Sequence, residues 1–177
     1  MIYYLIFIGL FIAVLLFISS RIRRAANRAF EPETIENAEF KINKPEGYLN
    51  PINNNSEYPF EAYTRELGEK SAGRYRKSLA KMSVSEGLIF KNTCQTAKIN
   101  ADNVYSETIL DNVPKGQKIC LIEGEKMEDD VNRLVFHKIV ESENQNKTYD
   151  LEVSIIEANE DEYIGKASEL INSFTVK

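Results

Sequence analysis

The sequence predicts an α+β protein in which a single N-terminal transmembrane helix is followed by an antiparallel-sheet domain with packed helices. Three observations lead to this fold class. Residues 1–20 are an uncharged apolar run that arginines follow. Residues 148–157 alternate apolar and polar side chains, which is typical of an antiparallel strand with one covered face. Residues 160–173 carry apolar side chains at helical spacing.

The first 28 residues are predicted to form a membrane anchor. At about 1.5 Å per residue, a helix over residues 1–20 spans roughly 30 Å, which is the thickness of one bilayer core. A cleaved signal peptide is the alternative, but no basic side chain precedes the apolar run and no Ala-x-Ala site follows it. We therefore expect a retained signal-anchor that places residues 1–20 in the lipid bilayer.

A cluster of arginines after the apolar run predicts the orientation of the chain. Cytoplasmic segments next to membrane helices carry an excess of basic residues, and no Lys or Arg precedes this run. The sequence therefore predicts a single-pass protein of a bacterial inner (plasma) membrane with a cytoplasmic C-terminal domain. The topology determinants are Arg21, Arg23, Arg24 and Arg28.

The chain beyond the anchor is acidic. The anchor holds four of the 22 basic residues and none of the 27 acidic ones, so the remainder has 18 basic residues and a net charge of −9. Repulsion by phosphate argues against nucleic acid as a partner. The predicted organisation is an anchor with its basic collar over residues 1–28, a linker over 29–38 and one soluble α+β domain over 39–177.

The first half of the domain is read from short local patterns. Pro32 and three glutamates indicate the linker. Phe40 and Ile42 share one face of a strand. The expected elements are a strand over 39–43, a turn over 44–47, an irregular loop over 48–58 and an ambiguous, strand-like segment over 60–67.

Residues 70–83 are predicted to form an amphipathic helix, because Ala72, Tyr75, Leu79 and Met82 recur at spacings of three and four. Another face of this helix carries a basic stripe, made of Lys70, Arg74, Lys77 and Lys81. The stripe is either a solvated helix face or a surface for anionic headgroups or an acidic partner. A short strand is expected over 87–91, and residues 92–115 give no readable pattern.

Three strands and a helix are predicted in the last third of the chain. The strands cover 117–124, 131–140 and 148–157, and short loops join them into a meander. An acidic turn over 128–130 separates the first two. The final helix covers 160–173, with Asn159 as its cap and Glu162 completing a capping box. The stripe expected to be buried consists of Ile164, Ala167, Leu170, Ile171 and Phe174.

Two short segments resemble the PsbP-like α/β/α sandwich domains, the family of the photosystem II extrinsic subunit P and its bacterial relatives. Residues 40–48, FKINKPEGY, resemble the opening strand and Pro-aromatic turn of that family. Residues 171–174, INSF, resemble its closing helix, which often ends on Ser-Phe. Members act mainly as non-catalytic binding or accessory domains, so the resemblance implies this fold and a binding role. It transfers no site residues.

No catalytic, cofactor or metal site is predicted. Residues 68–73 have the outer spacing of a phosphate loop but lack the lysine and hydroxyl that bind phosphate and magnesium. The single histidine, His137, either bonds locally on a strand or serves as the base for a thiol nucleophile at Cys94 or Cys120. These two cysteines are either free thiols or one disulfide.

The sequence therefore favours a membrane-anchored, non-enzymatic domain that recruits or supports a protein partner. Two alternatives stay open. One is an anchored thiol enzyme or hydrolase that uses the Cys/His pair. The other is a sensor of anionic lipid surfaces that uses the basic stripe.

Overall fold

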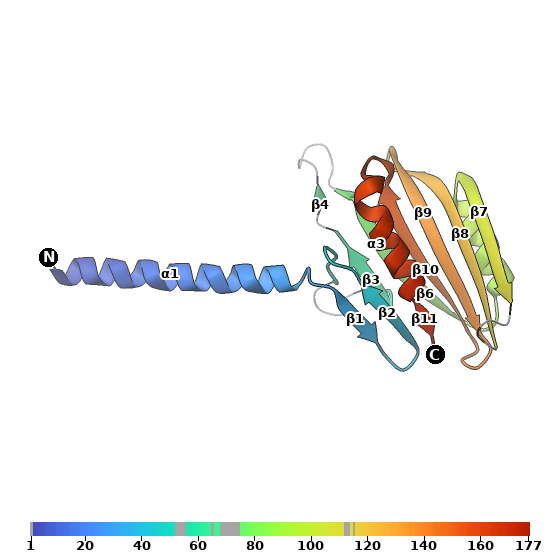
Figure 1. The fold of residues 1–177 in the computed structure, drawn as a ribbon, viewed down its shortest axis with the longest axis horizontal. Helices are drawn as coiled ribbons and strands as arrows, with labels where there is room; N and C mark the ends of the chain where they lie inside the picture. Colours follow the sequence, from blue (N-terminus) through green and yellow to red (C-terminus); the bar gives the residue numbers. More distant parts are fainter. Residues whose placement is uncertain (1, 52–55, 65, 68–74, 112–113, 115) are drawn as a thin grey trace.

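A long helix, α1 (Ile2–Arg28), projects from a layered domain in the computed structural model of the chain (Figure 1). The structure describes residues 2–51, 56–64, 66–67, 75–111, 114 and 116–177, and it describes the side chains of α1 over 11–24 and 27–28. The large apolar side chains described on α1 are all 48–66% exposed. Within the described part of the chain, no helix has both the length and the apolar content needed to cross a membrane.

Six antiparallel strands form the central sheet of the domain, in the order β3-β6-β10-β9-β8-β7. The three strands predicted in the last third of the chain are confirmed as the β8–β9–β10 meander, and the predicted acidic turn joins β8 to β9. The bounds are β3 (Phe60–Tyr63), β6 (Ser78–Glu86), β7 (Asn103–Asp111), β8 (Gln117–Glu128), β9 (Val131–Ser142) and β10 (Lys147–Ile156).

One face of this sheet is covered by α3 (Glu160–Ser173) and by a small sheet of β1 (Glu33–Glu36), β2 (Phe40–Lys44) and β11 (Thr175–Val176) (Figure 1). The main core fills this layer. Alternate residues of β10 are completely buried there, namely Tyr149, Leu151, Val153 and Ile155. Phe174 follows α3, and its ring lies 6.4 Å from each of the rings of Phe40 and Tyr149.

The predicted bounds of α3 are confirmed, but its predicted cap is wrong. Asn159 precedes the helix and makes no side-chain hydrogen bond to it. A short 3-10 turn, η1 (Glu157–Asn159), leads directly into α3 and places the Asn159 backbone outside the usual capping conformation. The acidic residues of the first turn still favour the helix dipole.

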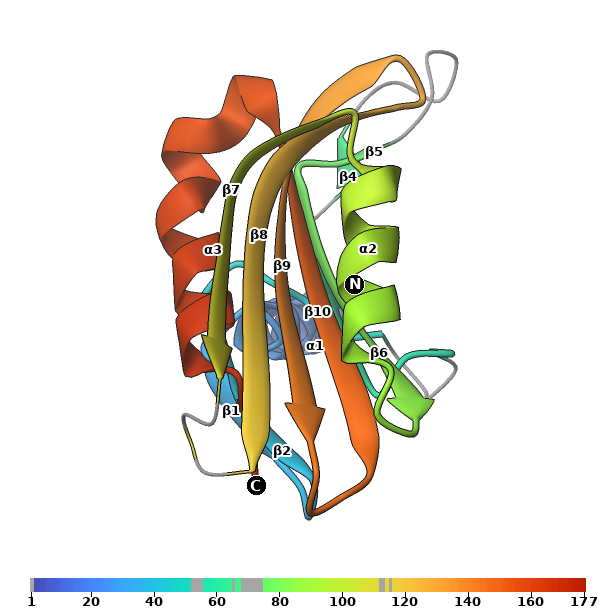
Figure 2. The same cartoon turned by 90° about the vertical axis from the view of Figure 1, so that its right-hand side faces the viewer.

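The opposite face of the sheet carries α2 (Phe90–Asn100), as Figure 2 shows. Both faces of the sheet are therefore covered, whereas the alternation of apolar and polar residues in β10 predicted that one face is exposed to solvent. The predicted strand over 87–91 is wrong, because Phe90 begins this helix. A second, smaller core forms where α2 meets β8 and β9, and it consists of Phe90, Cys94, Ala97, Cys120, Ile122 and Ile139.

The predicted helix over 70–83 is wrong wherever the structure describes it. A short hairpin of β4 (Glu66–Leu67) and β5 (Tyr75–Arg76) precedes β6, and residues 68–74 lie outside the described part. Ala80 and Met82 are completely buried, whereas the intervening Lys81 is not. This period of two fits a strand held between β3 and β10, so pairing across the sheet overrides the helix-like spacing.

The segment expected to be a linker is bonded to the domain. Residues of β1 pair with β2 in antiparallel register. The N–H of Gly47 donates to the carbonyl oxygen of Phe30 at 2.8 Å. Lys44 is 3% exposed, and its Nζ donates to the carbonyl oxygen of Ala29 at 3.1 Å. The connection that follows α1 is therefore fixed against the domain by β1 and by these two bonds.

Candidate functional site

Strand β7 forms an open edge of the central sheet. It pairs with β8 alone among the described strands, and eight of its nine residues are exposed. An edge strand presents unpaired N–H and C=O groups that can accept a further strand. Three of its large side chains are also well exposed: Tyr105 at 51%, Ile109 at 56% and Leu110 at 41%.

A groove of about 570 Å³ opens beside this edge, where the start of α2 meets the ends of β7 and β8. Its volume lies within the usual range of binding sites, about 300–1,000 Å³. Ile109 lines it, together with Leu88 and Ile89, which are 49% and 38% exposed. The charged side chains that line it are Lys91, Asp111, Lys118 and Glu141.

A buried carboxylate organises this groove. Glu141 is 3% exposed, and its Oε2 accepts the N–H of Phe90 at 3.0 Å. Its Oε1 lies 3.3 Å from Nζ of Lys118. Thr148 accepts the N–H of Ile89 at 3.2 Å. Because α2 lacks a side-chain cap of its own, these bonds from β9 and β10 satisfy its first amides and hold the groove wall in place.

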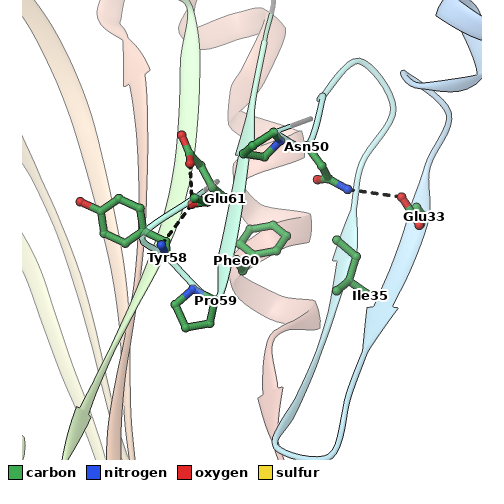
Figure 3. A pocket seen from close by; sticks show the side chains of 9 residues that line it. Glu33, Ile35, Asn50, Tyr58, Pro59, Phe60 and Glu61 are labelled. Atoms are coloured by element: carbon green, nitrogen blue, oxygen red, sulfur yellow. Dashed lines mark hydrogen bonds between the residues drawn. The ribbon is translucent and has the colours of Figure 1, made fainter. Parts of the chain in front are cut away.

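A second hollow, of about 460 Å³, lies between β1 and β3 near the end of α1 (Figure 3). Its polar side chains bond to one another. Asn50 donates to Glu33 at 3.4 Å, and Ser56 donates to Glu61 at 2.7 Å. Pro51 and Ser56 line the hollow, and residues 52–55 between them in the sequence lie outside the described part. We assign no chemistry to this hollow.

His137 has the local structural role that the sequence allowed. It is 7% exposed, and its Nδ1 lies 2.9 Å from Oδ1 of Asp150. In the described part of the chain, it forms no hydrogen bond with either cysteine. Cys94 and Cys120 are free, buried thiols in the core beneath α2. The hydrogen bond between the two thiols, together with burial, raises the pKa of Cys94, and the same hydrogen bond lowers the pKa of Cys120.

The His137–Asp150 pair predicts a pH-dependent stability. Burial lowers the pKa of His137, but the hydrogen bond and charge of Asp150, with the charge of Glu152, outweigh it and raise this pKa above 6.5. The folded protein then binds the proton more tightly than the unfolded chain does. The stabilisation is complete below pH 6.5 and is lost as the pH rises through the raised pKa.

We therefore expect the free energy of unfolding to fall as the pH rises above 6.5, and Asp150→Asn to flatten this dependence. Urea unfolding at several pH values measures it. Asp161→Asn, on the exposed first turn of α3, is the matched control and should keep the wild-type slope. A slope that Asp150→Asn leaves unchanged would show that another group titrates.

The structure describes two of the four basic residues that the sequence placed on one stripe. Lys70 and Arg74 lie outside the described residues. Nζ of Lys77 lies 2.9 Å from Oε2 of Glu162 in α3, and Nζ of Lys81 lies 3.4 Å from Oε2 of Glu152 in β10. The two described lysines therefore serve ion pairs within the domain. A role of the four residues in binding headgroups or a partner stays a prediction.

The arginines predicted as topology determinants lie on the last turns of α1, between the apolar run and the domain. All four side chains are exposed, and Arg21 lies over the ring of Phe17, 5.7 Å from its centre. In the described part, no three His, Cys, Asp or Glu side chains are grouped so as to hold a metal ion.

No protein-family model and no curated protein matches this sequence. The fold is similar to that of cyanobacterial PsbP (CyanoP) from Synechocystis sp. PCC 6803, with a TM-score of 0.53 at 14% identity, over 84% of this chain and 94% of that one. It is also similar to LpqN of Mycobacterium tuberculosis, a protein involved in cell envelope biogenesis, with a TM-score of 0.52 at 12% identity, over 83% and 91%. The predicted PsbP-like resemblance is confirmed at the level of the fold.

Proposed function

We propose that this protein is a membrane-anchored, non-enzymatic domain that docks a protein partner at the open edge of its central sheet. The docking edge consists of β7 and the groove beside it. One observation carries the proposal: β7, the strand of the docking edge, lies on the side of the domain opposite α1 (Figures 1 and 2). A domain tethered through α1 would present this edge away from the bilayer.

The exposure of α1 supports its role as the anchor. Eight large apolar side chains described on this helix, from Phe11 to Ile22, are each about half exposed or more. Such a surface is unfavourable in water and favourable in hydrocarbon. The helix satisfies its own backbone groups, which a segment in lipid must do. Residues 1–20 carry no charged side chain in the sequence.

The charge distribution supports a cytoplasmic domain at a bacterial inner membrane. The basic collar that ends α1 favours the cytoplasmic side. The domain beyond it is acidic, so an anionic leaflet repels it while attracting the collar. The bonds from Lys44 and Gly47 to the residues after α1 hold the domain against its anchor. Together these features favour a domain that is attached to the end of its anchor but does not lie on the membrane surface.

Position-specific photo-crosslinking in native membranes tests the proposal. Benzoylphenylalanine replaces Ile109 in the docking edge, and in the matched control it replaces the exposed Glu169 of α3. We expect a discrete adduct with a cytoplasmic protein from position 109 alone. Equal adducts from both positions, or none from position 109, would contradict docking at this edge. An adduct with a protein from the opposite side of the membrane would overturn the orientation.

A further inference from the structure

We propose that the partner binds the docking edge as an extended peptide, which adds a strand to β7 and presents an apolar side chain between two basic ones. This inference rests on the proposed docking function and identifies the partner segment by its chemistry. Main-chain hydrogen bonds would supply affinity, and alternate side chains would supply specificity.

Strand addition requires a sheet edge that is not already paired, and the two edges of the central sheet differ in this respect. At the β3 edge, the N–H of Leu49 donates to the carbonyl oxygen of Tyr63 at 2.8 Å, and the return bond is 2.9 Å. The chain itself therefore closes that edge at Tyr63, and β3 is only four residues long. The β7 edge has nine residues and, among the described residues, pairs only with β8. Strand addition is therefore favoured at β7.

The side chains of β7 define what the added strand must carry. Glu107, Ile109 and Asp111 alternate on one face, because they lie opposite Ile122, Cys120 and Lys118 on the side of the sheet that carries α2. The order on this face is acidic, apolar, acidic, and β7 contains no Lys or Arg. Side chains directly opposite each other in a sheet interact, so the complementary strand reads basic, apolar, basic at alternate positions.

The groove and the acidic side chains of β7 would each recognise a different part of the peptide. Ile109 lines the groove with Leu88 and Ile89, so the apolar side chain of the peptide would be buried there. Glu107 already bonds to Lys98 of α2 at 3.0 Å. Asp111 is therefore the acid that would discriminate most between basic and acidic peptides.

A second copy of this chain fits the edge less well than a basic peptide does. All charged side chains of β7 are acidic. Pairing β7 with itself would therefore bring carboxylates towards carboxylates, and like charges opposite each other in a sheet are destabilising. A basic peptide removes this repulsion and is also attracted by the net charge of −9 beyond the anchor.

The test measures the binding of a fluorescent heptapeptide to the full chain in lipid nanodiscs. The probe is Thr-Lys-Thr-Val-Thr-Lys-Thr, and the control probe has Glu in place of both Lys. We expect Ile109→Ser to weaken binding roughly tenfold, and Leu110→Ser, on the opposite face of β7, to change it little. Asp111→Lys should weaken binding of the basic probe and restore binding of the acidic one.

Backbone methylation of the probe separates strand addition from any other contact. Only every second amide of an added strand faces β7. N-methylation of one alternate set should therefore abolish binding, whereas methylation of the other set should be tolerated. Equal loss from both sets, or equal binding of both probes, would overturn the proposal. Dimerisation of the chain that increases with its concentration and that Ile109→Ser abolishes would also overturn the proposal.

The failure of this inference is distinguishable from a failure of the docking function. If position 109 crosslinks to a partner while neither probe binds, the docking function stands and addition of a basic strand is overturned.

Discussion

Replacing Phe174 by alanine is expected to destabilise the domain by about 3–5 kcal/mol, the usual effect of emptying a buried aromatic site. The Phe174 side chain is completely buried. Its ring meets those of Phe40 and Tyr149 in edge-on geometry, so one residue joins β2, α3 and β10. The substitution would leave a cavity at the junction of the three elements and weaken the attachment of α3.

Urea unfolding of the full chain in mild detergent measures this loss. Met127→Ala is the matched control, because Met127 is 59% exposed at the end of β8. We expect the control to change the free energy of unfolding by less than about 0.5 kcal/mol. A loss below about 1 kcal/mol for Phe174→Ala would contradict its position at the centre of the core.

The double substitution Phe11→Lys with Ile12→Lys is expected to release the chain from the membrane. Both side chains lie near the middle of the apolar run and are at least half exposed on α1. Each lysine near the centre of a membrane helix costs about 2.5–3.5 kcal/mol, and each lost apolar residue adds roughly 0.3–0.6 kcal/mol. The pair therefore opposes insertion by roughly 6–8 kcal/mol.

The fraction of the chain that stays with membranes after an alkaline wash measures this release. The matched control carries the same two lysines on the domain, at the exposed Ile99 and Met127, and should stay with the membrane like the wild type. Equal retention of the α1 variant and this control would contradict insertion of α1.

The elements that local sequence predicts correctly are long and strongly periodic. α3 and the β8–β10 meander have apolar patterns that continue for ten or more residues. Helix α2 could not be predicted from its local sequence, because only Phe90, Cys94 and Ala97 are buried along its 11 residues. Its first amide is satisfied by Glu141, 51 residues further along the chain. A local pattern cannot contain that contact.

The docking edge could not be predicted either, because it too depends on contacts that are distant in the sequence. β7 lies in the segment that showed no pattern, because an edge strand with exposed faces has no buried stripe to reveal it. Its status as an edge depends on the order of strands in the sheet. The same order explains β6, whose position between β3 and β10 overrides its helix-like spacing.

Amide hydrogen exchange of the full chain in lipid nanodiscs tests most directly whether this protein is an anchored domain with an open docking edge. We expect slow exchange across residues 2–20, because water does not reach a helix backbone in the bilayer core, and fast exchange at the outward-facing amides of β7. Fast exchange across residues 2–20, at the rate of an unprotected peptide, would contradict the anchor. Uniformly slow exchange along β7 would contradict the open edge.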